Sequence, residues 1–221
     1  MKGISVKELY NNISPLFASL FEGVTYPFEV LPQIGDFIKT LGPTLDSEVY
    51  NFLGDDIWIA KSAKIAPTAS ITGPCIIGEN TEVRHCAFIR GNALVGNDCV
   101  VGNSTELKNV VLIGKVQVPH YNYVGDSVLG YGSHMGAGSI TSNVKSDKTL
   151  VVLKQGDEKY ETGLKKFGAM LGDFVEVGCG SVLNPGTIIG KNTNIYPLSS
   201  VRGIVSSNSI YKCAGEIAEK Q

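Results

Sequence analysis

The sequence has little that marks a nucleic-acid-binding or membrane-spanning protein. Its 19 Lys and Arg residues nearly balance its 21 Asp and Glu residues, which leaves a formal net charge of -2 and no basic tail. Because nucleic acids and anionic membrane surfaces attract clustered Lys and Arg, we expect neither as a partner. No run reaches the roughly 18 apolar residues that a membrane span needs, and the N-terminus has no long apolar stretch, so we expect a cytoplasmic protein.

Cysteine is sparse and unpatterned. The five cysteines, Cys75, Cys86, Cys99, Cys179 and Cys213, form no C-x-x-C pair and are odd in number. We therefore expect reduced thiols and no disulfide framework. What remains is the composition of a globular protein, with 43% hydrophobic and 18% charged residues, so we expect one domain with appendages.

The dominant feature is a period of six residues, and such internal repeats are sought before secondary structure is assigned. Small residues usually stand two places before each aliphatic position of the period. The first run of the period is Ile59, Ile65, Ile71, Ile77, Val83, Ile89, Val95, Val101, Leu107 and Ile113. After a slip it resumes at Leu129, Met135 and Thr141, and after a longer insertion at Leu171, Val177, Leu183, Ile189, Ile195 and Val201.

This period fits neither a helix, at 3.6 residues per turn, nor a two-faced strand, but it fits a short strand and a tight turn repeated. Three such units make one triangular coil, and stacked coils bring the aliphatic residues into columns inside a prism. The sequence therefore predicts an all-β fold, a parallel β-helix built from hexapeptide repeats.

Four segments are expected around this period. Residues 1–55 form a small helical N-terminal cap, with a capping box at Ser5 and Glu8, and a later helix that stops at Gly42. Residues 56–205 form the β-helix, interrupted at residues 144–168 by a hairpin with a Gly-Asp turn. Residues 206–221 form a C-terminal tail that closes the other end or crosses to a neighbour.

Breaks in a repeat usually mark loops, and loops often carry function. The first break contains QVPHYNYVGD, residues 117–126, so we expect His120 to be displayed where the chain leaves the coil. The stretch ELKNVVLIGKVQVPHYNYVGDSVLGYGSHMGAGSITSN resembles the acetyltransferase half of the bifunctional bacterial enzyme that acetylates and then uridylylates glucosamine 1-phosphate. The stretch KKFGAMLGDFVEVGCGSVLNPGTIIG is similar to the β-helix part of archaeal sugar-1-phosphate nucleotidylyltransferases with the same acetyltransferase activity.

The chain thus resembles the hexapeptide-repeat acyltransferases from about residue 58 to 203. The resemblance implies a left-handed β-helix, a homotrimer, acetyl-coenzyme A as the co-substrate and no metal in the chemistry. It implies an N-acetyltransferase that moves an acetyl group to the amine of a hexosamine 1-phosphate, glucosamine 1-phosphate or similar. Residues 1–55 offer no glycine-rich nucleotide loop, so no nucleotidylyltransferase activity is expected.

The resemblance assigns roles to individual residues. By the match, His120 is the general base that takes a proton from the amine, and histidine suits this role because it titrates near neutral pH. Arg90 in FIRG and Lys108 in ELKN match cations that bind the substrate phosphate and sugar. Each follows an aliphatic position by one place, so the two should stack one coil apart as a phosphate clamp. Tyr123 and Asn143 match residues that contact the sugar.

Further positions match the donor site. Ala137 matches a residue whose backbone amide faces the acetyl donor, and Cys179 falls where the family has a serine near the pantetheine arm. The lysines expected at the coenzyme A phosphates, Lys148 and Lys166 with Lys165 and Lys212, are also consistent with ordinary surface positions. Structural roles also stay open as alternatives for other candidate residues. His120 would pack a turn, Arg90 and Lys108 would be a solvated pair, and Tyr123 would be a packing aromatic.

The chain also departs from the family. His134 replaces an asparagine near the substrate amine, where it would contact the substrate or assist His120, and Val144 replaces a tyrosine. Galactosamine 1-phosphate or a related amino sugar therefore stays open as the acceptor. Two other functions also stay open. One is a non-catalytic assembly or sensor subunit. The other is a γ-type carbonic anhydrase with zinc on His85, His120 and His134, whose spacing does not resemble that family's pattern.

Overall fold

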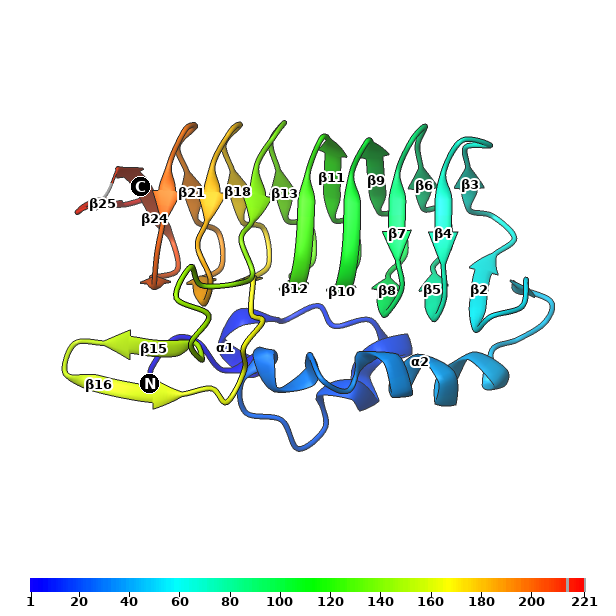
Figure 1. Ribbon diagram of the computed structural model, residues 1–221, viewed down its shortest axis with the longest axis horizontal. Coiled ribbons are helices and arrows are strands. Elements are labelled where there is room, and N and C mark those ends of the chain that lie inside the picture. Colours follow the sequence, from blue (N-terminus) through cyan, green and yellow to red (C-terminus); the bar gives the residue numbers. More distant parts are fainter. Residues whose placement is uncertain (214, 221) are drawn as a thin grey trace.

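The computed structural model describes residues 1–213 and 215–220, and most of them form short strands that wind into a β-helix. Figure 1 shows the coils stacked side by side along the long axis. Every strand-to-strand contact between successive coils is parallel, as in Ile57↔Cys75 and Ile77↔Val95. The predicted fold class is confirmed: an all-β, left-handed parallel β-helix of hexapeptide repeats, with a helical N-terminal segment and a hairpin insertion.

The strands line three faces of the prism. The first face contains β3 Lys64–Ile65, β6 Glu82–Val83, β9 Val100–Asn103, β11 Gln117–His120, β13 His134–Met135, β18 Glu176–Val177, β21 Asn194–Ile195 and β24 Ser209–Cys213. The second contains β4 Ser70–Thr72, β7 Phe88–Arg90, β14 Ile140–Thr141, β19 Val182–Leu183 and β22 Ser200–Val201. The third contains β2 Ile57–Ala60, β5 Cys75–Ile77, β8 Ala93–Val95, β17 Ala169–Leu171, β20 Thr187–Ile189 and β23 Ile204–Val205.

Two longer strands, β10 Glu106–Leu112 and β12 Tyr123–Leu129, run from the second face into the third. Each pairs with a second-face strand through its first half and a third-face strand through its second half, as β10 does with β7 and β8. Five residues instead of six separate the inward Leu107 from the inward Leu112, so each long strand crosses the corner in a shortened repeat.

The shortened repeats correct two expectations. Leu112, not Ile113, continues the inner column, and Ile113 belongs instead to the outer cluster. The segment around His120 is not an excursion either, because Val118 pairs with Val101 and is fully buried in the core. The irregularity in the period comes from repeats that are one residue short at a corner, and the chain stays in the coil throughout.

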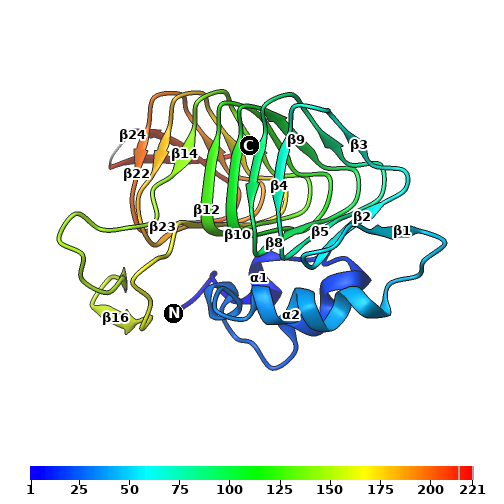
Figure 2. The ribbon, with the colours of Figure 1, turned by 45° about the vertical axis from the view of Figure 1, so that its right-hand side comes forward.

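The N-terminal segment lies along the third face rather than over the end of the prism, as Figures 1 and 2 show. It comprises α1 Val6–Leu9, the 3-10 helices η1 Pro15–Phe21 and η2 Pro27–Val30, α2 Ile34–Leu41, η3 Gly42–Thr44 and the strand β1 Tyr50–Phe52. The capping box at Ser5 and Glu8 is present, but α1 ends at Leu9, and a separate 3-10 helix begins after Ser14 because Pro15 favours a new start.

This position has a physical cause in the outward side chains of the third face. These are apolar and stand one place from the inward residues: Trp58, Ile76, Leu94, Val111, Val128, Met170 and Ile188. Helical residues such as Phe17, Phe28 and Ile38 cover them and are themselves almost fully buried. Burying such side chains contributes about 1.5–3 kcal/mol each, so the segment is bound to the side of the prism.

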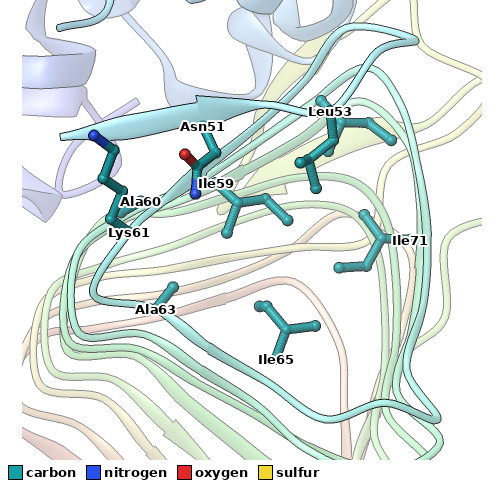
Figure 3. A pocket seen from close by; sticks show the side chains of 9 residues that line it. Asn51, Leu53, Ile59, Ala60, Lys61, Ala63, Ile65 and Ile71 are labelled. Carbon is teal, nitrogen blue, oxygen red and sulfur yellow. The ribbon is translucent and has the colours of Figure 1, made fainter. Parts of the chain in front are cut away.

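The N-terminal end of the prism is consequently open. A cavity of about 440 Å³ there is lined by Ile59, Ile65 and Ile71 of the first coil, which Figure 3 shows pointing inward. At the other end, β24 continues the stack, β25 Glu216–Glu219 folds back on it antiparallel, and Tyr211 is buried against the core. No helix within the described residues is long and apolar enough to cross a membrane.

The insertion is a hairpin, as predicted, of β15 Val152–Gln155 and β16 Glu158–Glu161 around Gly156 and Asp157. It packs on the N-terminal segment instead of projecting freely. Lys2 and Gln155 exchange two hydrogen bonds of 2.9 and 3.0 Å, and Tyr160 lies against Tyr26 and Phe28. The insertion leaves the coil directly after Asn143 and returns at Phe167, whose N–H donates to the Asn143 carbonyl.

Candidate functional site

The second face collects most of the residues predicted to bind an acceptor. Parallel pairing places Glu106 between Phe88 and Tyr123, and Ile89 beside Leu107. Arg90 and Lys108, which follow Ile89 and Leu107, therefore stack one coil apart on this face, as the period of six predicts.

Both cations of the expected clamp already have carboxylate partners. Arg90 Nη1 lies 2.7 Å from Glu106 Oε1, in a pair whose side chains are 46% and 31% exposed. Lys108 Nζ lies 3.2 Å from Asp126 Oδ2, and here the side chains are 23% and 5% exposed. The hydrogen bond to Glu106 raises the pKa of Arg90. The face is therefore a balanced set of charges rather than two unpaired cations.

Asp126 is the centre of this polar cluster and was missed by sequence reasoning. Besides Lys108, it accepts a hydrogen bond of 3.0 Å from Asn109 Nδ2 and a short one from Asn143 Nδ2. The amide of Asn143 also donates to the Tyr123 hydroxyl, at 3.2 Å. The sequence contained one signal for Asp126, the five-residue step of each shortened repeat. Asn109 and Asp126 stand at the two corners where these steps occur.

The Tyr123 ring lies over the backbone of its own strand, β12, at Gly125. A Cβ at Gly125 would lie 2.5 Å from the Tyr123 hydroxyl, so only glycine leaves room for the ring to pack here. Partial burial, with the charges of Asp126 and Glu106 nearby, raises the pKa of Tyr123. Its hydroxyl therefore stays protonated at neutral pH and can donate a hydrogen bond outward.

The predicted base lies at the corner where the first face meets the second. His120 ends β11, its side chain is exposed, and within the described residues no side chain bonds to its imidazole. The N–H of Gly138 donates to the His120 carbonyl, and that of Gly180 to the Ala137 carbonyl. His120, Ala137 and Cys179 thus occupy successive coils of one corner, which puts His120 and Cys179 about 10 Å apart at the usual strand spacing of about 4.8 Å.

His134 lies away from the second-face cluster. It pairs with Gln117 and Glu176 on the first face, and its Nδ1 lies 2.8 Å from Glu176 Oε2. Its predicted grouping with the other candidate acceptor-binding residues is therefore not reproduced within one chain. The carboxylate fixes the ring so that Nε2 is the nitrogen left for another partner.

The predicted donor lysines are scattered. Lys148 stands in a turn before the hairpin, Lys165 and Lys166 at the base of the insertion, and Lys212 is paired with Glu216 at 3.0 Å. A cavity of about 270 Å³ beside Asn143 is lined instead by Lys145 and Arg202, together with Ser142, Val144, Ser146, Asp147, Asn184 and Pro185.

All five cysteines are free, as predicted, and they fall into two groups. Burial raises the pKa of Cys75 and of Cys99 to about 12, so these thiols are inert near neutral pH. Cys86, Cys179 and Cys213 are exposed. In the described part of the chain, no three His, Cys, Asp or Glu side chains gather as a metal-binding group.

Comparison with known proteins finds matches to part of this chain. The family described as the GMPPB C-terminal domain matches residues 71–154. A bifunctional sugar-1-phosphate nucleotidylyltransferase/acetyltransferase from Sulfurisphaera tokodaii is 31% identical over 105 residues, which are 48% of this chain and 26% of that protein. The bifunctional protein GlmU of a Synechococcus strain is 29% identical over 158 residues, 72% of this chain and 26% of its own.

Among solved structures, a hexapeptide transferase family protein from Anaplasma phagocytophilum is similar with a TM-score of 0.40 and 17% identity, covering 74% of this chain and 78% of that one. The alignments span about a quarter of the length of the curated relatives. The predicted resemblance to proteins named for sugar-1-phosphate nucleotidylyl and acetyl transfer is confirmed over about half of the chain.

Proposed function

We propose that this protein is an N-acetyltransferase that moves an acetyl group from acetyl-coenzyme A to the amine of a hexosamine 1-phosphate. The observation that carries the proposal is the position of His120, exposed and without a side-chain partner among the described residues. It lies at a corner between a polar face that suits a sugar phosphate and a run of residues, Gly136 to Gly138, with almost no side chains.

The chemistry follows from that position. The amine nitrogen attacks the thioester carbonyl carbon, and His120 takes the proton that the nitrogen loses as the C–N bond forms. When the tetrahedral intermediate collapses, the C–S bond breaks, and the proton passes to the thiolate of coenzyme A. An exposed imidazole without a carboxylate partner suits both steps, since it is free to accept and then to return the proton.

The second face supplies the acceptor site. The Arg90 to Glu106 pair is exposed, and exposed ion pairs contribute little to stability, so a phosphate can replace Glu106 as the partner of Arg90. Lys108 keeps Asp126 and adds a second positive charge. The Tyr123 hydroxyl and the Asn143 amide provide the groups that orient the sugar ring.

The corner supplies the donor site. At Gly138 an added Cβ would meet no atom within 4 Å. The pantetheine arm can therefore approach the backbone at Ala137 and, in the adjacent coil, at Cys179. Lys148 and Lys166 are proposed for the phosphates of coenzyme A, in a cytoplasmic homotrimer whose neighbouring chains complete each site.

The paired cations of the second face favour a second candidate function, a non-catalytic β-helix subunit. An acceptor panel separates the two. Release of free coenzyme A thiol from acetyl-coenzyme A would be measured with glucosamine, galactosamine and their 1-phosphates. Release that depends on a hexosamine 1-phosphate supports the transferase and names the acceptor. Silence across the panel, with no binding of acetyl-coenzyme A, supports the non-catalytic subunit.

A further inference from the structure

We infer that Asp126 is a positioning residue that fixes which hydrogen-bonding groups the second face presents to the acceptor, an inference that rests on the proposed function. Its carboxylate touches three side chains, Lys108, Asn109 and Asn143, and is itself buried. All three come from coils next to that of Asp126, so the carboxylate connects three successive coils.

The shortened repeats build this arrangement. In β10 and β12 the chain crosses the corner with one residue in the left-handed region, Asn109 at φ 54° and Asp126 at φ 48°. Asn and Asp are the non-glycine residues that adopt this conformation most readily. The pairings Lys108↔Gly125 and Val110↔Ser127 put Asn109 directly beside Asp126. Asn143 occupies the corresponding corner of the next coil, so the corner is an Asn, Asp, Asn ladder.

The hydrogen bonds around Asp126 leave one orientation for the Asn143 amide. The Asn143 Nδ2 donates one hydrogen bond to the Tyr123 hydroxyl and one to Asp126, so both N–H groups of the amide are used. The flipped amide would place Oδ1 against the Asp126 carboxylate, where two acceptors repel each other. Oδ1 is therefore left as an acceptor, suited to a hydroxyl or ammonium group of the sugar.

Lys108 is oriented by the same carboxylate. Both Asp126 oxygens lie near its ammonium, at 3.2 and 3.4 Å, and the third N–H is available to an anion. The acceptor site therefore presents the fixed Lys108 ammonium to a phosphate and the fixed Asn143 carbonyl oxygen to a hydroxyl or ammonium group of the sugar. Asp126 contacts Lys108 and Asn143 rather than the acceptor itself, and it fixes the orientation of both side chains.

The substitution Asp126→Asn tests this inference, because it keeps the shape and removes the charge. The new amide lets Asn143 flip and leaves Lys108 without its partner, so we expect the KM for a hexosamine 1-phosphate to rise by roughly tenfold or more. The KM for acetyl-coenzyme A should stay within about twofold, since its site is at the His120 corner. Asp126→Glu should restore part of the acceptor affinity.

Asp173 provides the matched control. It is also buried and also accepts hydrogen bonds from three residues, Asn11, Asn12 and Tyr131, but it lies against the N-terminal segment. Asp173→Asn should lower the melting temperature and leave both KM values unchanged. An Asp126→Asn enzyme with the wild-type acceptor KM, or an Asp173→Asn enzyme with the same rise, would overturn the inference. A wild-type enzyme that transfers no acetyl group would overturn the proposed function, and the inference with it.

Discussion

The second and third faces of the β-helix share one backbone geometry and one buried interior, yet their outer surfaces serve different purposes. On the third face the outward column is apolar, from Trp58 through Leu94 to Ile188, and the N-terminal segment covers it. On the second face the outward residues include the charged Arg90, Glu106 and Lys108. The interior pattern thus sets the coil, while the outward residues decide which face is covered and which stays exposed.

The largest effect expected from this comparison is on stability. Leu94→Ala should lower the free energy of unfolding by about 2–5 kcal/mol, because Leu94 is fully buried between the third face and the N-terminal segment. Thr72→Ala, on the exposed second face, should change it by no more than about 0.5 kcal/mol. Urea unfolding of the two variants measures both values, and equal losses would mean that the faces do not differ as described.

The next effect concerns catalysis at the corner. His120→Ala should lower turnover by roughly 100-fold or more while the acceptor KM changes little, as expected for loss of a general base. His134→Asn changes a first-face side chain outside the second-face cluster, so its turnover should stay within roughly tenfold of the wild type. Steady-state kinetics of both variants distinguishes the histidines. If His134→Asn has the larger loss, the His134 and Glu176 pair is the base instead.

A smaller effect separates two surface ion pairs of similar geometry. Arg90→Gln should raise the KM for a hexosamine 1-phosphate roughly tenfold and leave that for the unphosphorylated sugar unchanged, because one charge-assisted bond to phosphate is lost. Arg84→Gln is the control, since Arg84 also pairs with a glutamate, Glu82, at 3.1 Å, but on the first face. Similar KM values for Arg90→Gln and Arg84→Gln would remove Arg90 from the phosphate site.

The smallest effect is protection of a thiol. Saturating coenzyme A should slow alkylation of Cys179 severalfold and leave Cys86 unaffected. Both thiols are exposed on the same corner, but Cys179 follows Ala137 on the side proposed for the donor, and Cys86 lies on the other side of His120. Cys75 and Cys99 should not react in the native protein. Mass spectrometry of the alkylated peptides gives the rate at each cysteine. Unprotected Cys179 would place the pantetheine arm elsewhere.

The sequence predicts the interior well because burial repeats with the coil. Val83, Ile89, Val95 and Val101 are all buried at the positions that the period requires. Ile113 was assigned wrongly because an aliphatic residue stands on each side of the shortened repeat, and a count by six continues to the wrong one. Only the pairing between coils, which places Leu112 beside Val95, shows that this repeat is one residue shorter than the others.

The candidate site was predictable only in part. The period places Arg90 and Lys108 on one edge, but their partners Glu106 and Asp126 come from neighbouring coils at sequence separations that no local pattern reveals. The position of the N-terminal segment had a visible signal, the apolar residue beside each inward position, as in Trp58 and Ile76. A solvated outer face would alternate with polar residues, so two adjacent apolar positions indicate a covered face.

The most direct test of the proposed function is the ratio of kcat/KM for a hexosamine 1-phosphate to that for the same unphosphorylated sugar, with coenzyme A thiol release as the readout. The second face, with Arg90 and Lys108 on one edge, predicts measurable transfer and a preference of at least roughly tenfold for the phosphorylated acceptor. Equal use of both sugars, or no transfer to either, would contradict it.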